Sequence, residues 1–259
     1  MIVSGISRPE LYVFTPTTAR RNGAAIIIFP GGGYWVNALS HEGTDVAREC
    51  AKWGLTAFVV KYRIPDSATM INPSLSPFQD AQQAMLRVRS EAKKYGIDPA
   101  RIGIMGFSAG GHLAATLATR FDEPLLPGAS ATSLRPAFAA LIYPVISADS
   151  SIAHHGSFDK LLGKSASPAT LDSFSHEKNV NENTPPVFLI HANDDDVVPV
   201  QNSLRFYEAM LQHKRPVELH LYPSGGHGFG MNNPRATGKW MNELRTWLTD
   251  IKMISHHAK

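Results

Sequence analysis

The stretch Gly106-Phe107-Ser108-Ala109-Gly110 has the spacing of a serine nucleophile held on a tight turn. The apolar residues before it predict a short buried strand, and the small residues from His112 onward predict a helix. This order places the Ser108 hydroxyl above the sheet edge and points the helix N-terminus toward it. Glycines two positions to either side leave room where the two backbones crowd. We therefore predict that Ser108 is a nucleophile, rather than an incidental serine in a glycine-rich loop.

A serine hydroxyl needs a base within hydrogen-bonding reach, and the chain contains eleven histidines. His227 lies among glycines in the segment 224–229, directly after residues that predict a strand. Such a loop can carry the imidazole over the edge of the sheet. The alternative is a loop histidine with no chemical role. The sequence favours His227, because most other histidines lie near predicted helix starts or within predicted strands.

An acid that orients the base is the third group required, and Asp194, Asp195 and Asp196 follow a predicted strand at 187–191. Three adjacent carboxylates also suit a solvated turn or a metal site. The apolar residues and Pro199 that follow indicate that the chain returns into the fold there. The order serine, acid, histidine along the chain is typical of one fold of alternating strands and helices.

Strands and helices alternate along the whole chain, which predicts an α/β fold. We expect a mostly parallel central sheet of about seven or eight strands with helices on both faces. The predicted strands are 11–14, 24–29, 55–62, one ending at 106, 137–145, 187–191 and 217–222; the predicted helices are 42–53, 78–95, one from 112, 201–213 and 235–253. Residues 146–186 are polar and too long for a plain connection, so we expect a small cap-like insertion within a single domain, 1–259.

The amino-acid composition limits the kinds of binding partner and the cellular compartment that we expect for this protein. The chain has 259 residues, 43% hydrophobic and 18% charged, which is ordinary for a globular enzyme. A net charge of only +3, with lysine and arginine scattered, argues against nucleic acid or a membrane surface as partner. Cys50 is the only cysteine, which excludes an internal disulfide, and its apolar neighbours predict a buried helix position. The first residues lack a signal-peptide pattern and no apolar run approaches transmembrane length, so we expect a cytoplasmic protein.

Together these motifs resemble the α/β-hydrolase superfamily over essentially the whole chain, and within it the small bacterial esterases grouped with acetyl-xylan and other sugar-ester deacetylases. The family's acid motif, His-Gly-x-x-Asp-x-x-Val-Pro, implies that Asp195 is the acid, with Val198 and Pro199 in register and Ala192 in place of glycine. The resemblance is carried by Pro30-Gly31-Gly32-Gly33-Tyr34, by the segment 106–112, by Thr184-Pro185-Pro186, by the segment 191–199 and by Gly226-His227-Gly228-Phe229.

The resemblance also implies a role for the loop 30–34, whose backbone N–H groups would complete an oxyanion hole. We assign Gly32, Gly33 and Ala109 as the donors, each worth about 3 to 4 kcal/mol of barrier. Pro30 stands where many of these esterases have histidine. A phosphate cradle is the alternative, but the loop lacks the Lys-Ser/Thr pair of a Walker sequence.

Tyr34, Trp35 and Phe229 flank the predicted hole and base, where they could form an aromatic wall that binds substrate or could belong to the core. The sequence thus predicts a cofactor-free and metal-free serine esterase. Its substrate is a small-molecule ester, an acetylated sugar or oligosaccharide above all. A general short-chain carboxylesterase or a small serine peptidase stays open, as does a homo-oligomer. From another class, a non-catalytic binding module on the same fold stays open too.

Overall fold

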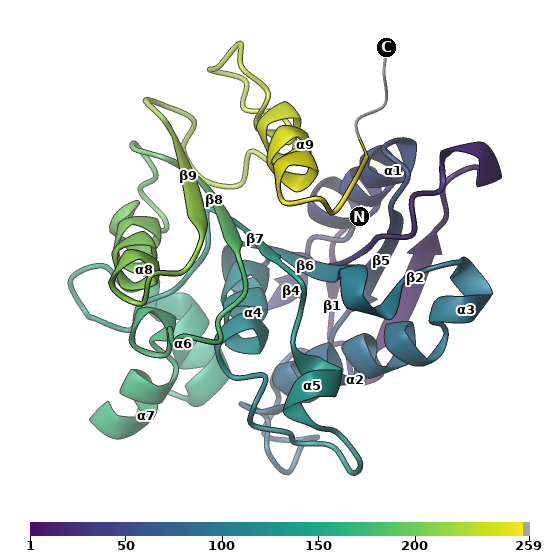
Figure 1. The fold of residues 1–259 in the computed structure, drawn as a ribbon. Helices are drawn as coiled ribbons and strands as arrows, with labels where there is room; N and C mark the ends of the chain where they lie inside the picture. Colours follow the sequence, from purple (N-terminus) through teal and green to yellow (C-terminus); the bar gives the residue numbers. More distant parts are fainter. Residues whose placement is uncertain (256–259) are drawn as a thin grey trace.

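The strand β3 (Ala25–Phe29) lies in the interior of the sheet, because its five apolar residues suit a position that is buried on both faces. The other strands of this sheet are β2 (Glu10–Phe14), β5 (Thr56–Lys61), β6 (Ile102–Phe107), β7 (Ala139–Ile142), β8 (Val187–Ala192) and β9 (Val217–Tyr222). In this computed structural model, which describes residues 1–255, the strand order is β2-β5-β3-β6-β7-β8-β9 (Figure 1). All neighbouring pairs are parallel except β2 with β5, which confirms the predicted sheet.

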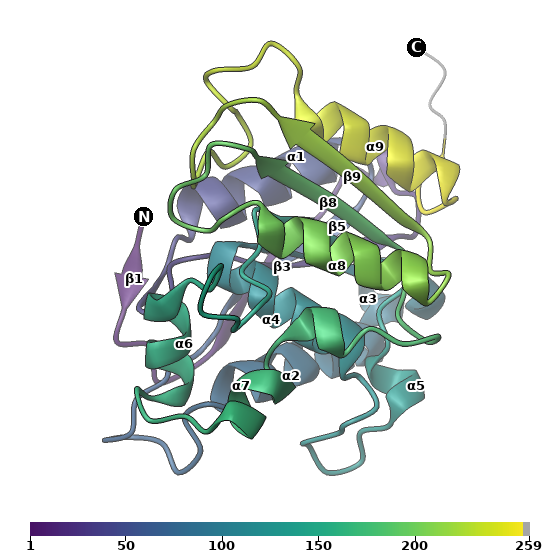
Figure 2. The same cartoon turned by 90° about the vertical axis from the view of Figure 1, so that its left-hand side faces the viewer.

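Helices cover both faces of the sheet (Figure 2). One face carries α1 (Asp45–Lys52) and α9 (Trp240–Asp250), and the other carries α2 (Ser76–Ser90), α4 (Ser108–Thr119) and α8 (Gln201–Gln212). The side chains of β3 alternate between the two layers. Ile27 and Phe29 belong to the apolar cluster with α2, α4 and α8, whereas Ile26 and Ile28 belong to the cluster with α1 and α9.

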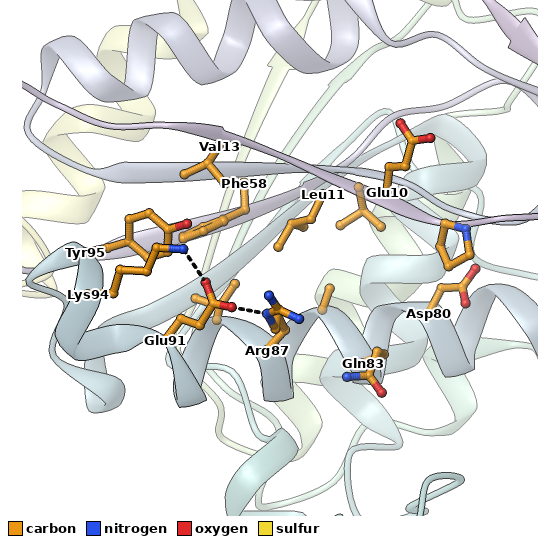
Figure 3. A pocket seen from close by; sticks show the side chains of 14 residues that line it. Glu10, Leu11, Val13, Phe58, Asp80, Gln83, Arg87, Glu91, Lys94 and Tyr95 are labelled. Carbon is orange, nitrogen blue, oxygen red and sulfur yellow. Dashed lines mark hydrogen bonds and ion pairs between the residues drawn. The ribbon is translucent and has the colours of Figure 1, made fainter.

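At the β2 edge of the sheet, a hollow of about 390 Å³ lies between the strands and the helices α2 and α3 (Ala92–Tyr95) (Figure 3). Its apolar floor includes Leu11 and Phe58, and Glu91 pairs with Arg87 and Lys94 along the helical side of its rim. None of the residues predicted to carry chemistry lines this hollow. The groups that could act on a substrate therefore lie elsewhere, at the carboxyl ends of the strands.

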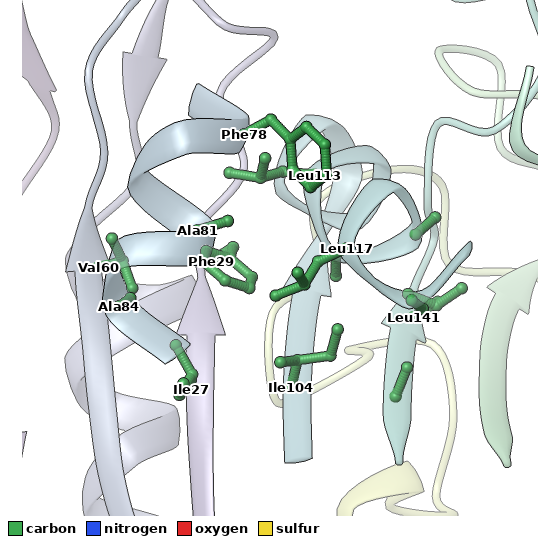
Figure 4. Packing of buried hydrophobic residues seen from close by; sticks show 14 of the residues in the cluster. Ile27, Phe29, Val60, Phe78, Ala81, Ala84, Ile104, Leu113, Leu117 and Leu141 are labelled. Atoms are coloured by element: carbon green, nitrogen blue, oxygen red, sulfur yellow. The ribbon is translucent and has the colours of Figure 1, made fainter. Parts of the chain in front are cut away.

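The layer between the sheet and α2 and α4 forms the larger core (Figure 4). Ile27 and Ile104 are register partners on adjacent parallel strands, and both side chains are fully buried in this cluster. From the helices, Phe78 of α2 and Leu113 of α4 pack into the same cluster. A close-packed layer of this kind holds the start of α4, and with it Ser108, against the sheet.

Several predicted boundaries are wrong for identifiable reasons. The strand predicted at 137–145 ends at Ile142, because Tyr143 has φ 35° and a proline follows it. The helix predicted at 235–253 begins only at Trp240, after Pro234 and Gly238. The helix predicted at 42–53 begins with a π-helical turn over Ser40–Thr44 before α1. The small pair β1 (Val3–Ser4) and β4 (Val36–Asn37) is too short to be recognised in the sequence.

Residues 146–186 lie over the side of the sheet that carries α4 and α8. They contain α6 (His155–Leu162), α7 (Pro168–Ser173) and a 3-10 turn, His176–Lys178. The buried rings of Phe158 and Phe174 pack around His112 of α4 and fasten this segment to the core. Across residues 1–255, no helix has the length and apolar character needed to cross a membrane.

Candidate active site

Ser108 is the first residue of α4 and lies directly after β6, with φ 52°. This left-handed conformation is strained for a residue with a side chain, and it persists where the surrounding structure enforces it. The backbone after Ser108 packs tightly against the end of β3, because a Cβ at Gly110 would collide with the carbonyl oxygens of Phe29 and Pro30. The predicted strand, turn and helix are therefore present, and the turn holds Ser108 at the carboxyl edge of the sheet.

The imidazole of His227 lies between Ser108 and Asp195. Its Nε2 is 2.8 Å from the Ser108 Oγ, and its Nδ1 is 2.7 Å from the Asp195 Oδ2. An ionised carboxylate can only accept, so the Nδ1 carries a proton and the Nε2 is left to accept the serine hydroxyl hydrogen. Gly226 and Gly228, at φ 63° and 75°, let the loop between β9 and α9 turn sharply on both sides of His227.

The carboxylate of Asp195 is buried and fully engaged. Its Oδ1 accepts hydrogen bonds from the backbone N–H groups of Val197 and Val198, at 3.0 and 2.8 Å. Its Oδ2 faces His191 as well as His227. Burial by itself would raise the pKa of Asp195, but the hydrogen bonds from His191 and His227 outweigh it and hold the pKa below its usual value. Asp195 is therefore ionised at neutral pH.

The other two aspartates of the run point elsewhere. Asp194 accepts hydrogen bonds from the N–H groups of Gly225 and Gly226, at 2.7 and 2.8 Å, and pairs with Arg235. It therefore organises the loop that carries His227. Asp196 is exposed. Among residues 1–255, no group of three or more histidine, cysteine, aspartate or glutamate side chains is arranged to hold a metal ion.

The loop 30–34 bends against Ser108. Gly31 approaches so closely that a Cβ there would lie 2.9 Å from the Ser108 Cβ. Gly32, Gly33 and Tyr34 follow with φ of 128°, 64° and 62°, all in the region that favours glycine. Within the described part of the chain, the N–H groups of Gly32 and Gly33 donate to no protein acceptor. They are thus free to donate to a ligand atom.

Of the three aromatic residues for which a wall or a core position was open, Tyr34 belongs to the core, because only 1% of it is exposed. Its hydroxyl lies 2.8 Å from the Nδ1 of His112, and the Nε2 of His112 lies 2.9 Å from the Phe174 carbonyl oxygen. A carbonyl can only accept, so the Nε2 is protonated and the Tyr34 hydroxyl donates to the Nδ1. Burial lowers the pKa of His112 to about 4, which keeps the ring neutral.

Trp35 is 58% exposed, and the ammonium group of Lys160 lies 4.8 Å from its ring centroid. Phe229 packs edge-on against Tyr143 and is half-buried. Two of the three predicted wall residues therefore border the surface near the loop 30–34 and the histidine. Cys50 is buried as predicted, and burial raises the pKa of its thiol to about 12.

Sequence reasoning missed several polar side chains that contact these groups. His191 lies within β8, a position that predicts no chemical role for a histidine, yet its ring contacts Asp195. Glu42 contacts Gly31, 11 residues before it, and Tyr143, 101 residues after it, and nothing in its local sequence signals this. For His154 of the segment 146–186, the sequence leaves open a place in the pocket lining or in a solvated loop; the side chain is half-buried and hydrogen-bonds to Ser157 beside Gly33.

Comparison with known proteins places the chain in a family. The model of the BD-FAE family matches residues 11–210. The chain belongs to the BD-FAE family. Among curated relatives of this BD-FAE protein, an acetylxylan esterase of Xylanibacter ruminicola is 36% identical over 96% of the chain and 50% of the relative. Endo-1,4-beta-xylanase B of Butyrivibrio fibrisolvens is 37% identical over 83% of the chain and 34% of the relative. The BD-FAE chain thus spans half or less of the length of these two relatives.

Solved structures agree with this assignment. An acetyl ester-xyloside bifunctional hydrolase from Caldicellulosiruptor lactoaceticus is 34% identical, with a TM-score of 0.85 over 98% of this chain and 97% of that one. The carboxylesterase Cest-2923 from Lactobacillus plantarum, at 22% identity and a TM-score of 0.78, shares the fold. The BD-FAE protein has the α/β-hydrolase fold, and the predicted resemblance to esterases of this superfamily is confirmed.

Proposed function

We propose that this protein is a serine carboxylic-ester hydrolase that removes acetyl groups from sugars or oligosaccharides. The observation that carries the proposal is the continuous contact from Ser108 through His227 to Asp195, at 2.8 and 2.7 Å. The names of the acetylxylan esterase and of the acetyl ester-xyloside hydrolase support the acetyl-sugar substrate.

In the proposed reaction, the Ser108 Oγ attacks the ester carbonyl carbon while its proton moves to the Nε2 of His227. The carbonyl oxygen becomes an oxyanion, which accepts hydrogen bonds from the N–H groups of Gly32, Gly33 and Ala109. Collapse of this intermediate breaks the bond to the alcohol oxygen, and the alcohol takes the proton from His227. An acetyl group is then bound to the Ser108 Oγ.

Water completes the cycle. His227 removes a proton from a water molecule as its oxygen attacks the acyl carbon, and the second intermediate releases acetic acid and the Ser108 hydroxyl. Asp195 stays ionised throughout, fixes the Nδ1–H form of His227 and stabilises the imidazolium. The exposed ring of Trp35 borders this site and offers a flat apolar surface for a sugar ring.

The test is hydrolysis of p-nitrophenyl acetate and of acetylated xylo-oligosaccharides by wild type and Ser108→Ala. We expect the variant to fold and to lose activity by a factor on the order of 10⁶. A fluorophosphonate should label the wild type only. A wild type that is neither labelled nor active on any ester would leave the non-catalytic binding module as the better interpretation. The expected cytoplasmic location stays a prediction, which cell fractionation checks.

A further inference from the structure

Glu42 is a carboxylate that the reaction outlined above does not use, although it is only 4% exposed. It lies in the π-helical turn before α1. A buried carboxylate costs free energy unless hydrogen bonds compensate it. In the described part of the chain, no lysine or arginine pairs with Glu42, and the Nε2 of the half-exposed His41 lies 3.7 Å from its Oε1. The compensation comes instead from two neutral donors.

The first donor belongs to the glycine loop. The Oε2 of Glu42 accepts the backbone N–H of Gly31 at 2.9 Å. A Cβ at Gly31 would lie 2.6 Å from this oxygen and 2.9 Å from the Ser108 Cβ, so the Gly31 backbone is held between the two side chains. The peptide of Gly31 leads directly into Gly32 and Gly33. Its orientation therefore constrains the direction in which the chain enters Gly32 and Gly33.

The second donor belongs to the other side of the site. The hydroxyl of Tyr143 donates to the Oε1 of Glu42 at 2.7 Å and accepts the N–H of Gly230 at 2.9 Å. The Tyr143 ring stands edge-on to His227, with centroids 5.0 Å apart. Tyr143 has φ 35°, a conformation that its surroundings must enforce. The hydroxyl thus links Glu42 to the loop that carries His227.

We propose that Glu42 is a positioning residue that joins the oxyanion loop to the histidine loop and keeps both aligned on Ser108. This role rests on the proposed esterase function. The positioning role requires both side-chain oxygens of residue 42 to accept a hydrogen bond, and a carboxylate supplies two such acceptors. Glutamine supplies one, so its NH₂ group would face either the Gly31 N–H or the Tyr143 hydroxyl hydrogen, and one of those donors would be left without a partner.

Three variants test the role. Glu42→Gln disturbs both links, and Tyr143→Phe removes only the link to the histidine loop. Glu49→Gln is the matched control, because Glu49 is a partly exposed acid of α1 that pairs with Lys52. The measurements are kcat and KM for p-nitrophenyl acetate per active site titrated with a fluorophosphonate. A further measurement is the inhibition constant of an alkyl trifluoromethyl ketone, whose adduct with serine carries an oxyanion.

We expect Glu42→Gln to lower kcat per titrated site by about 10- to 100-fold, because small misplacements of donors at a reacting centre have effects of that size. KM should change little, and the ketone should bind more weakly by a similar factor. Tyr143→Phe should lower kcat by a smaller factor. Glu49→Gln should leave both quantities within about twofold, as exposed ion pairs contribute little.

The role is overturned if Glu42→Gln lowers the melting temperature alone and keeps wild-type kcat and ketone affinity per site. If Glu42→Gln does not fold, Tyr143→Phe decides by the same criteria. The two proposals fail separately. An inactive, unlabelled wild type removes the esterase function and this role with it, whereas an active wild type with an unaffected Glu42→Gln removes only the role of Glu42.

Discussion

The Nε2 of His191 lies 3.2 Å from the Asp195 Oδ2, the same oxygen that faces His227. It also lies 2.9 Å from the carbonyl oxygen of Val198, so this nitrogen must carry the proton. The Nδ1 then accepts the hydroxyl hydrogen of Ser203, at 2.8 Å. Through this chain of contacts, β8 and α8 hold the same carboxylate oxygen that contacts His227.

We therefore predict that His191→Phe lowers kcat by about tenfold and destabilises the fold by about 1 to 3 kcal/mol, because Asp195, Val198 and Ser203 lose a buried partner. His220→Phe is the control, since His220 is a half-buried strand histidine of β9 that pairs with Glu218. Steady-state kinetics and urea unfolding give the two quantities. Equal effects of both substitutions would contradict a specific role for His191.

A second prediction separates the three consecutive aspartates. Asp195→Asn should lower kcat by about 10⁴-fold, because an amide in place of the carboxylate favours the wrong tautomer of His227. Asp194→Asn should have a smaller effect, through the loop at Gly225 and Gly226, and Asp196→Asn almost none. The measurement is kcat of each variant on p-nitrophenyl acetate, with and without a chelator. Equal losses, or sensitivity to the chelator, would point to a metal site instead.

A third prediction concerns stability in acid. Burial depresses the pKa of His112 to about 4 and that of His176 well below its usual value. In the unfolded chain a histidine has a pKa of about 6.5. Below that pH the unfolded chain therefore binds more protons than the folded chain. Stability should fall as the pH drops from about 6.5 toward 4, by up to about 1.4 kcal/mol per pH unit for each ring.

Urea unfolding of wild type and His112→Gln between pH 7 and 4.5 checks this prediction. The variant should be less stable at pH 7, because Tyr34 and the Phe174 carbonyl lose their partner, but its stability should fall less steeply with pH. Loss of the Asp195 contribution begins only below about pH 4, since the folded-state pKa of that group is depressed. Parallel curves for the two proteins would refute the assignment to His112.

A fourth prediction is that kcat/KM falls from p-nitrophenyl acetate to butyrate to octanoate. Trp35 and His154 limit the room for an acyl chain beside Gly33. A Cβ on this glycine would lie 3.2 and 3.9 Å from atoms of their rings. An open apolar pocket would instead gain about 0.8 kcal/mol per methylene, roughly fourfold in specificity. A maximum at octanoate, measured below micellar concentrations, would favour a long-chain esterase.

Much of the fold was predictable because its signals are local. The continuous apolar run of β3 requires burial on both faces, and a glycine at 106 is demanded by the backbone carbonyl oxygen of Gly110, which a Cβ there would meet at 2.0 Å. The motif after β8 likewise contains within nine residues both Asp195 and the backbone donors that bind it. The structure has these features where the local sequence patterns predict them.

Other parts depend on contacts between distant segments, which one sequence does not reveal. Glu42 and Tyr143 are 101 residues apart, and each looks unremarkable in its own segment. The inward direction of Tyr34 follows from its φ of 62° and from His112, 78 residues away. The sequence predicts that Tyr34 lies next to the glycine loop, but only the backbone conformation decides which way its ring points.

The link from the Phe174 carbonyl to His112 and on to Tyr34 constrains any engineering of the segment 146–186. Inserted between β7 and β8, this segment looks like a cassette that could be exchanged for one from another hydrolase to change specificity. A graft without a carbonyl acceptor at the place of Phe174 would strip His112 of its partner and loosen Tyr34, the residue that follows the glycine loop. Such chimeras must therefore transplant the helix contacts together with the segment.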